Sequence, residues 1–396
     1  MFLITSALGF LQPFVPIYLQ AAALSRAEIG LISGLGTGAA LLIQPVLGRL
    51  SDRRDARRSL MVACALTASF AFTCYRFANG LWAFVALSAI GINGTMYLNA
   101  ATGVMIARIS PRGAGGRTYA SYRVWGSVGY IVVALAAGWL LHLFRTDTSR
   151  SMDRSMLAPV FAYGPIIFVL VAVSALFTPD RRATVDDTPV LGPERGHPTR
   201  PDRERAMRRF LTAFFLYQFS LYGASAYLSL YMQELGAGPL WVTGMFAGGV
   251  VCEVLVMTRI GGVSDRLGRR PVLAVAFVAL PIRLLCYMPA TGPVWVMVVQ
   301  LLHGLNFGIM GAIAVVYIND LASDSERGRA QARLAAAGGL ASAAGPLLCG
   351  LIAQAYGLVA MFGVMAVIGA IGAVYFLSRV PESHPIRTME SKIEAR

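Results

Sequence analysis

The sequence contains few charged residues. Only 14% of its 396 residues are Asp, Glu, Lys or Arg, whereas 56% are hydrophobic. Because soluble domains carry about 25% charged residues, this composition excludes an ordinary soluble protein. The hydrophobic residues fall in runs of roughly 20, the length that crosses a bilayer as a helix.

Cysteine is also scarce, and its placement excludes a metal site. All five cysteines lie inside hydrophobic runs without metal-ligand spacing; they are Cys64, Cys74, Cys252, Cys286 and Cys349. The isolated Ser, His and Asp residues form no recognisable catalytic triad. We therefore expect a protein that is not an enzyme and that needs no cofactor and no metal.

The net charge of +14 is compatible with nucleic-acid binding. However, most Lys and Arg lie in short segments between hydrophobic runs rather than on one face of a folded domain. These basic segments follow every second run, as the positive-inside rule requires of a membrane protein. We therefore exclude nucleic acid as a partner. We predict a multi-pass protein of the cell (inner) membrane, in contact with the lipid bilayer and with both termini cytoplasmic.

Hydropathy and helix breakers predict an all-α membrane protein with twelve transmembrane helices in two six-helix halves. The halves cover 1–178 and 208–380, a cytoplasmic linker covers 179–207, and a cytoplasmic tail covers 381–396. The expected helices are 1–23, 29–50, 59–78, 81–107, 118–144, 157–178, 208–232, 240–264, 271–290, 293–320, 330–354 and 357–379. The first run has no charged region before it, so it does not resemble a cleaved signal peptide. It also lacks a cytoplasmic segment before the first helix, which a start further upstream would explain.

A short motif occurs once in each half. The copies read Gly48-Arg-Leu-Ser-Asp52-Arg53 and Gly261-Gly-Val-Ser-Asp265-Arg266-Leu-Gly268-Arg269-Arg270. A repeat over this distance indicates a duplicated six-helix unit, as in many secondary carriers. The pattern resembles the signature loop of the major facilitator superfamily. The second copy matches it throughout, whereas the first has Asp55 where Gly is expected.

This resemblance implies the major facilitator fold and solute transport by alternating access. In that superfamily the loop aspartate and arginine hold the two halves together on the cytoplasmic side. The gating role would fall on both copies of the motif, at Gly48, Asp52, Arg53, Gly261, Asp265, Arg266, Gly268 and Arg269.

Four ionisable residues lie well inside the predicted helices: Arg123, Glu253, Arg283 and His303. A charge at the bilayer centre costs ~2.5–3.5 kcal/mol, so such groups usually face a cavity and pair with each other or with a substrate. Glu253 is the only acid at this depth and is the candidate proton carrier, with Arg283 and His303 as coupling residues. A fixed Glu253–Arg283 ion pair that only holds helices together is the structural alternative.

Around these positions the chain resembles lactose permease and its relatives. The matching segments are Gly9-Phe-Leu-Gln-Pro13-Phe-Val-Pro16 and Arg123-Val-Trp125-Gly126-Ser-Val-Gly129-Tyr130. The resemblance places substrate contacts on Arg123 and Tyr130, and coupling on Arg283 and His303. Asn306 stands where that family's proton-carrying glutamate is expected, so we do not expect lactose specificity. Phenylpropionate-permease-like relatives are more similar, since they too carry a Glu in the eighth helix.

Further polar residues are candidates for lining the solute passage: Gln12, Asn99, Tyr222 and Asn306. Three groups that can carry a positive charge, against one acid, favour an anionic or polyhydroxylated solute. We therefore predict a monomeric, proton-coupled importer of a small organic solute, such as an aromatic or organic acid or a sugar-like compound. The alternative is a proton-antiporting exporter of drugs or sugars, although such carriers often have a proline after the position of Gly126. A membrane sensor is a third possibility, disfavoured because the tails and linker are short.

Overall fold

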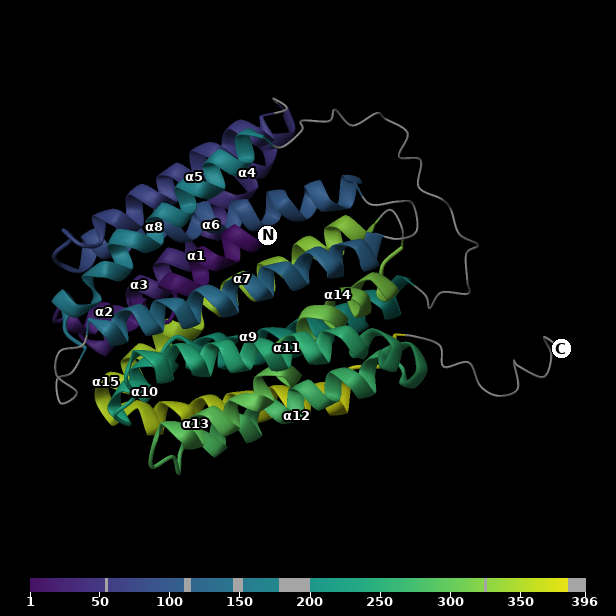
Figure 1. Cartoon of the computed structure of the whole chain (residues 1–396). Helices are drawn as coiled ribbons and strands as arrows, with labels where there is room; N and C mark the ends of the chain where they lie inside the picture. The colour runs from purple at the N-terminus through teal and green to yellow at the C-terminus, as the bar shows by residue number, and fades with distance from the viewer. Residues whose placement is uncertain (54–55, 110–114, 145–151, 178–199, 324–325, 384–396) are drawn as a thin grey trace.

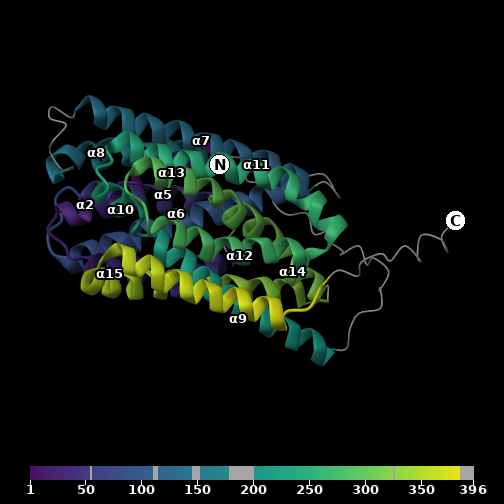
Figure 2. The ribbon, with the colours of Figure 1, turned by 90° about the horizontal axis from the view of Figure 1, so that it is seen from below.

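The computed structural model describes residues 1–53, 56–109, 115–144, 152–177, 200–323 and 326–383. These described residues form helices and connecting turns, without a strand. The helices run side by side along one direction, and the view turned by 90° shows the same elongated bundle (Figures 1 and 2). The all-α fold predicted from hydropathy is therefore confirmed.

The helices of the first part of the chain are α1 (Phe2–Leu11), α2 (Val15–Ala21), α3 (Arg26–Gly38), α4 (Ala40–Arg53), α5 (Arg57–Cys74), α6 (Leu81–Ile109), α7 (Gly115–Leu143) and α8 (Arg154–Leu176). Those of the second part are α9 (Arg200–Ser225), α10 (Leu228–Glu234), α11 (Pro239–Leu267), α12 (Arg269–Tyr287), α13 (Pro293–Val299), α14 (Ile309–Leu321) and α15 (Arg327–Arg379). A 3₁₀ turn, Gln300–Leu302, and a π-helical segment, Gly304–Gly308, join α13 to α14.

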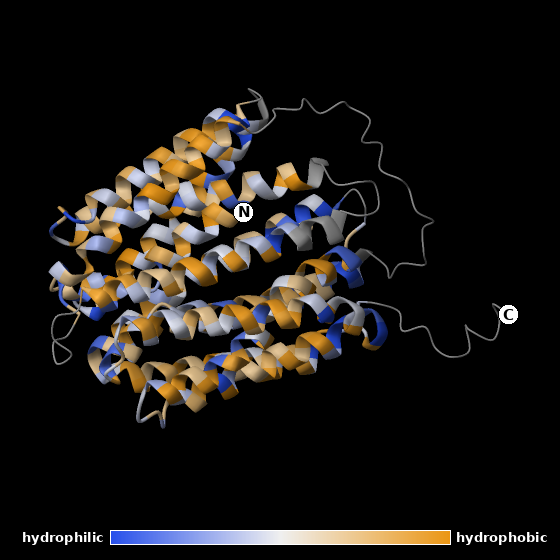
Figure 3. Cartoon of the chain, viewed as in Figure 1, coloured by the Kyte–Doolittle hydropathy of each residue, from blue (hydrophilic) through white to orange (hydrophobic). Residues whose placement is uncertain are grey.

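Nine segments of the described chain are long and apolar enough to cross a membrane. One of them, α15, is divided at Gly357, whose φ of 85° is not helical. Hydrophobic residues cover the length of the bundle and hydrophilic residues gather at its two ends (Figure 3). Large apolar side chains such as Phe70, Trp82 and Val298 are exposed, as expected where lipid replaces water. The chain is thus a multi-pass membrane protein, and the count of twelve spans stays a prediction.

Several of the expected helices differ from the structure. Those expected over 29–50, 208–232 and 293–320 are each divided into shorter segments. The helix expected over 1–23 is interrupted after Leu11, because Pro13 has no N–H to continue the ladder. The helix expected from residue 208 begins at Arg200, with Asp202 favourably placed in its first turn. Residues 179–199 of the predicted linker and 384–396 of the predicted tail lie outside the described residues.

Helices α1–α8 lie on one side of the bundle and α9–α15 on the other (Figure 1). The principal contacts between these two groups join α3 to α15 and α7 to α11. At Gly30 of α3, an added Cβ would lie 2.5 Å from the Pro346 carbonyl oxygen of α15. Only glycine permits so close an approach of the two backbones. The domain boundaries proposed from the sequence stay a prediction.

One end of the bundle is closed by contacts between the two groups of helices. There the Arg26 guanidinium pairs with the Glu234 carboxylate and donates to the Ala353 carbonyl over 3.2 Å. The Arg26 N–H donates to Gln354 Oε1 over 3.0 Å. We call this end, at α2 and α10 (left in Figure 1), the closed end.

The opposite end lacks such close packing at the two signature glycines. A Cβ added at Gly48 or at Gly261 would meet nothing within 4 Å. We call this end, which carries the two signature loops, the open end.

Candidate functional site

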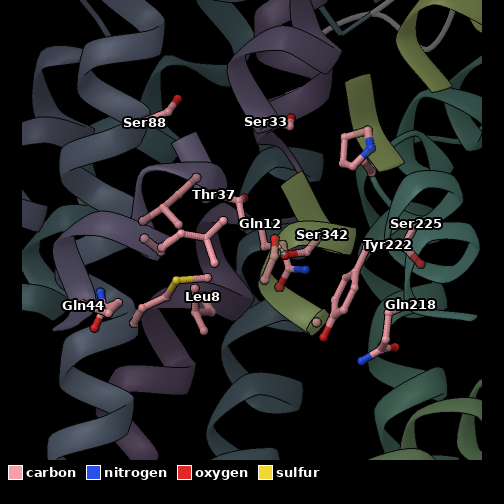
Figure 4. A pocket seen from close by; sticks show the side chains of 18 of the residues that line it. Leu8, Gln12, Ser33, Thr37, Gln44, Ser88, Gln218, Tyr222, Ser225 and Ser342 are labelled. Atoms are coloured by element: carbon pink, nitrogen blue, oxygen red, sulfur yellow. Dashed lines mark hydrogen bonds between the residues drawn. The ribbon is translucent and has the colours of Figure 1, made fainter. Parts of the chain in front are cut away.

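A cavity of ≈ 1040 Å³ lies between the two groups of helices. Most of its lining residues on one side come from α1, α3, α4 and α6, and most of those on the other from α9 and α15. Toward the open end its wall includes Gln331 and Ala332, near the start of α15. Most lining residues are apolar. The polar ones are Gln12, Ser33, Thr37, Gln44, Tyr75, Ser88, Gln218, Tyr222, Ser225, Ser229, Gln331 and Ser342, many of them drawn in Figure 4.

Two of the predicted substrate residues belong to this wall. Gln12 lies where α1 ends, and Tyr222 points into the cavity from α9 (Figure 4). Arg123, Tyr130 and Asn99 are not among the described residues that line it. The Asn99 amide donates one turn back, to the Thr95 carbonyl over 3.1 Å.

The structure brings the four ionisable residues of the membrane region into one network. Glu253 is its centre: one carboxylate oxygen lies 3.5 Å from Arg123 Nη2 and the other 3.7 Å from His303 Nε2. Arg123 belongs to α7 and Glu253 to α11, so their pair crosses between the two groups of helices. The Glu253 side chain is 12% exposed and that of Arg123 38%.

Arg283 extends the network and is only 2% exposed. Its guanidinium donates to Tyr287 Oη over 2.8 Å, to Gln300 Oε1 over 2.8 Å and to Asn306 Oδ1 over 3.3 Å. Its Nη2 also lies 3.4 Å from His303 Nδ1. His303 therefore stands between the Arg283 and Glu253 side chains.

The ion pair between Glu253 and Arg283 that the sequence left open as an alternative is not formed. Among the described residues, the ion-pair partners of Glu253 are Arg123 and His303. Asn306 is fully buried, with its amide shared between Arg283 and the Ala276 carbonyl. It supports the network and does not line the cavity.

The irregular helix between α13 and α14 positions His303. A Cβ added at Gly304 would lie 2.5 Å from the Cys252 carbonyl oxygen, so this backbone packs directly on α11 next to Glu253. The π-helical turn begins at this contact, and such turns are frequent at functional sites.

Two members of the network were missed from the sequence. Tyr287 follows Arg283 by one helical turn, and this spacing was a usable signal. Gln300 lies in an apolar run, one turn before His303. Nothing in the pattern of that run shows which way its amide points.

Aromatic rings connect the network to the cavity. The Phe307 ring stacks on the His303 imidazole, with centroids 4.2 Å apart and planes 18° apart. Tyr222 meets Phe307 edge to face, with centroids 6.1 Å apart. Because Tyr222 lines the cavity, the Phe307 ring lies between His303 and a side chain of the cavity wall.

The second signature loop forms contacts within the second group of helices. Gly268 ends α11 with a φ of 93°, a conformation that favours glycine. Arg269 Nη1 lies 2.5 Å from Asp265 Oδ1, and Arg269 Nε lies 3.2 Å from Asp320 Oδ2. The Arg269 N–H donates to the Glu382 carboxylate over 3.0 Å. No described partner of Asp265 lies in the first group of helices.

In the first signature loop, Asp52 and Arg53 are described only as backbone. Gly48 lies in α4, which ends at Arg53. The side chains of Asp52 and Arg53 lie outside the described residues, and Arg266 lies in α11, in the last turn. The gating role of the two loops therefore stays a prediction.

Known proteins resemble this chain over most of its length. A sequence profile of the MFS_1-like family matches residues 1–364. The multidrug resistance protein MdtG of Yersinia enterocolitica is 24% identical, covering 100% of this chain and 94% of that protein. The maltose permease of Geobacillus stearothermophilus is 27% identical, and the match covers 85% of this chain and 82% of that protein.

A solved structure shows the same fold. A variant of the nucleoside transporter NupG superimposes with a TM-score of 0.78 at 16% identity, covering 96% of this chain and 98% of that one. At this identity the likeness shows the fold alone, which is that of major facilitator transporters. Together with the family match over residues 1–364, it establishes that the chain belongs to the MFS_1-like family of membrane transporters.

Proposed function

We propose that the protein is a proton-coupled importer of a small organic solute that works by alternating access. The observation that carries this proposal is the network centred on Glu253, which joins α7 to α11 beside the cavity. The Glu253 carboxylate can take up a proton, and it lies at a contact between α1–α8 and α9–α15.

Protonation of Glu253 would weaken this contact. The carboxylate attracts the Arg123 guanidinium as long as it is charged, and buried ion pairs cost most when one partner is lost or neutralised. With Glu253 neutral, α7 and α11 are freer to move relative to each other. His303, 3.7 Å away, is the neighbour to which this proton can pass.

The solute would bind in the cavity, with its polar end toward the network. Arg123 has five N–H donors and uses one nitrogen for Glu253, so others remain for a hydrogen-bond acceptor of the solute. Arg123 and Tyr130 do not line the cavity, so we assign them to the part of the solute that extends from the cavity toward Glu253. We assign Gln12 and Tyr222 to the cavity wall.

The orientation of the open end completes the proposal. The signature loops lie there, and the distribution of basic residues assigns these loops to the cytoplasm. We therefore propose that this conformation is the inward-open state. Opening to the outside requires the contacts of Arg26 at the closed end to separate.

Export by proton antiport is the second candidate. It is supported by the largely apolar cavity wall and by the likeness to MdtG, which is named as a multidrug resistance protein. Both candidates use the same network and differ in the direction of solute movement relative to the proton.

One experiment separates the two candidates. A thermal-shift screen against sugars, aromatic acids, nucleosides and cationic drugs would first identify a ligand, since a ligand that binds the native state raises its Tm. Proteoliposomes loaded with a pH gradient would then be given that ligand outside. Accumulation when the outside is acidic supports import, whereas accumulation only when the inside is acidic supports export. Movement that ignores the gradient in both directions would contradict proton coupling.

A further inference from the structure

The part of the cavity wall that the structure describes carries no fixed charge. Among its described lining residues the only ionisable side chains are those of Tyr75 and Tyr222, whose phenols are neutral at physiological pH. The other polar lining groups are amides and hydroxyls. A solute charge placed against this wall would therefore meet no counter-charge there, although burying an unpaired charge is costly.

The charges of the neighbouring network are already paired. Glu253 lies between Arg123 and His303, and Arg283 is held by Gln300, Tyr287 and Asn306. A solute carboxylate would compete with Glu253 for Arg123, whereas a solute hydroxyl could use the remaining Arg123 donors and leave that pair intact. The network therefore accommodates an uncharged solute at lower cost.

Neutral hydrogen-bonding groups converge on one part of the cavity. Gln12 at the end of α1 faces Tyr222 of α9 and Ser342 of α15, with Gln218 one turn away on α9 (Figure 4). Gln218 Oε1 is buried and has no hydrogen-bond partner among the described residues. A buried amide with an unused acceptor usually calls for a partner, and a solute donor could supply it after a rotation of the amide.

The rest of the wall is hydrophobic and partly aromatic. It includes Phe72, Phe214 and Phe246. Its volume of ≈ 1040 Å³ is at the upper end of the roughly 300–1,000 Å³ of sites that bury drug-sized ligands. A bare monosaccharide would leave most of this apolar surface uncovered.

We infer that the solute is an uncharged amphipathic molecule, with an aromatic or aliphatic body and hydroxyl or amide groups that bind Gln12, Gln218 and Tyr222. This inference rests on the proposed function, since it names the solute class of the same cavity. It narrows that proposal, which includes organic acids.

Binding to the purified full-length protein, without any gradient, tests the solute class. The uncharged probes are phenyl β-D-glucoside, adenosine and N-acetylphenylalaninamide, and the comparison probes are 3-phenylpropionate, which is anionic, and glucose, which lacks an apolar body. We expect at least one uncharged aromatic probe to raise Tm and the two comparison probes to do so much less. Stabilisation by 3-phenylpropionate alone, or by none of the uncharged aromatic probes, would overturn the inference.

Substitutions locate the site. Gln218→Leu and Gln12→Leu each remove one neutral hydrogen-bonding group and should raise the Kd of the bound probe about three- to tenfold. Gln20→Leu is the matched control, because Gln20 is an exposed amide of α2 that does not line the cavity; it should leave Kd unchanged. If Gln218→Leu lowers the Tm of the ligand-free protein, Gln218→Asn is used in place of Gln218→Leu. Asparagine keeps the amide but moves it away from the cavity by one methylene group. An unchanged Kd in both Gln12 and Gln218 variants would overturn the assignment.

Failure of this inference is distinguishable from failure of the proposed function. If only 3-phenylpropionate binds and a pH gradient drives its uptake, the importer proposal stands and the solute class is wrong. If an uncharged probe binds through Gln218 but no gradient drives its movement, the solute class stands and proton coupling is wrong.

Discussion

At the residue scale, Glu253 lies between the Arg123 guanidinium and the His303 imidazole, which belong to different helical segments. Its carboxylate lies 3.5 Å from Arg123 Nη2 and 3.7 Å from His303 Nε2. Under the proposed function, this carboxylate would hold the helices together when charged and release them when protonated. A carboxylate that paired with only one of these segments could not connect α7 to the segment that carries His303.

Glu253→Gln should abolish uphill accumulation of the solute driven by a proton gradient, because the amide cannot carry a proton. Exchange of labelled for unlabelled solute should persist, since exchange needs no net proton movement. Both are measured in proteoliposomes with the ligand from the screen. Normal accumulation by the variant would show that Glu253 is structural, and would make His303 the next candidate proton carrier.

Arg123→Lys should weaken solute binding by at least about tenfold although it keeps the positive charge. A guanidinium can bond Glu253 and the solute at once through a planar fork, which an ammonium cannot reproduce. Tyr130→Trp should be tolerated far better than Tyr130→Ala, because it keeps an aromatic face. Equilibrium binding to the purified variants measures each effect. A Kd for Arg123→Lys equal to that of the parent would mean that Arg123 makes no specific contact with the solute.

The ionisable residues of the site could be recognised from the sequence, but their pairing could not. A charge within an apolar run is conspicuous because burying it is costly. Which partner it faces depends on how each helix is rotated, and helices that are apolar on all sides carry no periodic signal for that rotation. Glu253 was for this reason considered with Arg283, whereas it pairs with Arg123.

At the scale of elements, the segment from α13 to α14 owes its irregular path to close packing on α11. Gly304 lies against the Cys252 backbone, and a Cβ there would approach the carbonyl oxygen to 2.5 Å. Backbone atoms cannot yield as a flexible side chain can. The glycine therefore fixes the distance between His303 and Glu253.

Gly304→Ala should push this segment away from α11, lower the Tm and reduce proton-driven transport together. Its matched control is Gly311→Ala in α14, because a Cβ at Gly311 meets nothing within 4 Å. Alanine also favours a regular helix over glycine by about 1 kcal/mol, so Gly311→Ala should keep the Tm or raise it. Parent-like Tm and transport in Gly304→Ala would contradict this account of the packing.

Hydropathy predicted most helices, because long apolar runs and the signature repeat depend on composition and not on contacts. The interruption near Pro13 and the extension of α9 back to Arg200 were missed. The first was missed because the run stays largely apolar on both sides of Gln12 and Pro13. The second arose because a helix can continue beyond its apolar part when Asp202 favours its first turn.

At the scale of the whole molecule, the second signature loop is expected to control the open end. Asp265→Asn should increase labelling of single-cysteine cavity positions by a membrane-impermeant thiol reagent applied from the cytoplasmic side. The reason is that Asp265 orients Arg269, which the superfamily resemblance assigns to the contacts that close this end. Asp52→Asn should act in the same direction but less strongly, since its loop departs from the superfamily pattern. Labelling equal to that of the parent would count against the gating role.

The closed end depends on a small set of polar contacts at Arg26, and these should set the population of the outward-open state. Arg26 is the first residue of α3, so its N–H has no partner within the helix and is free to donate to Gln354 of α15. The Arg26 side chain reaches Glu234 and the Ala353 carbonyl. The Tyr227 hydroxyl donates to the Arg26 carbonyl over 2.9 Å.

Glu234→Gln removes the ionic part of this set and leaves the contacts of the Arg26 backbone. Exposed ion pairs contribute about 0.2–1 kcal/mol, so labelling of a cysteine at Ser33 or Ser342, which line the cavity, should rise up to about fivefold from the outside. Arg26→Gln, which also removes the contact with Ala353, should have the larger effect. Asp202→Asn is the control, because Asp202 pairs with Arg205 one turn along the same helix. If outside labelling is equal in all three variants, the closed end is held by the packing of α3 on α15 and not by Arg26.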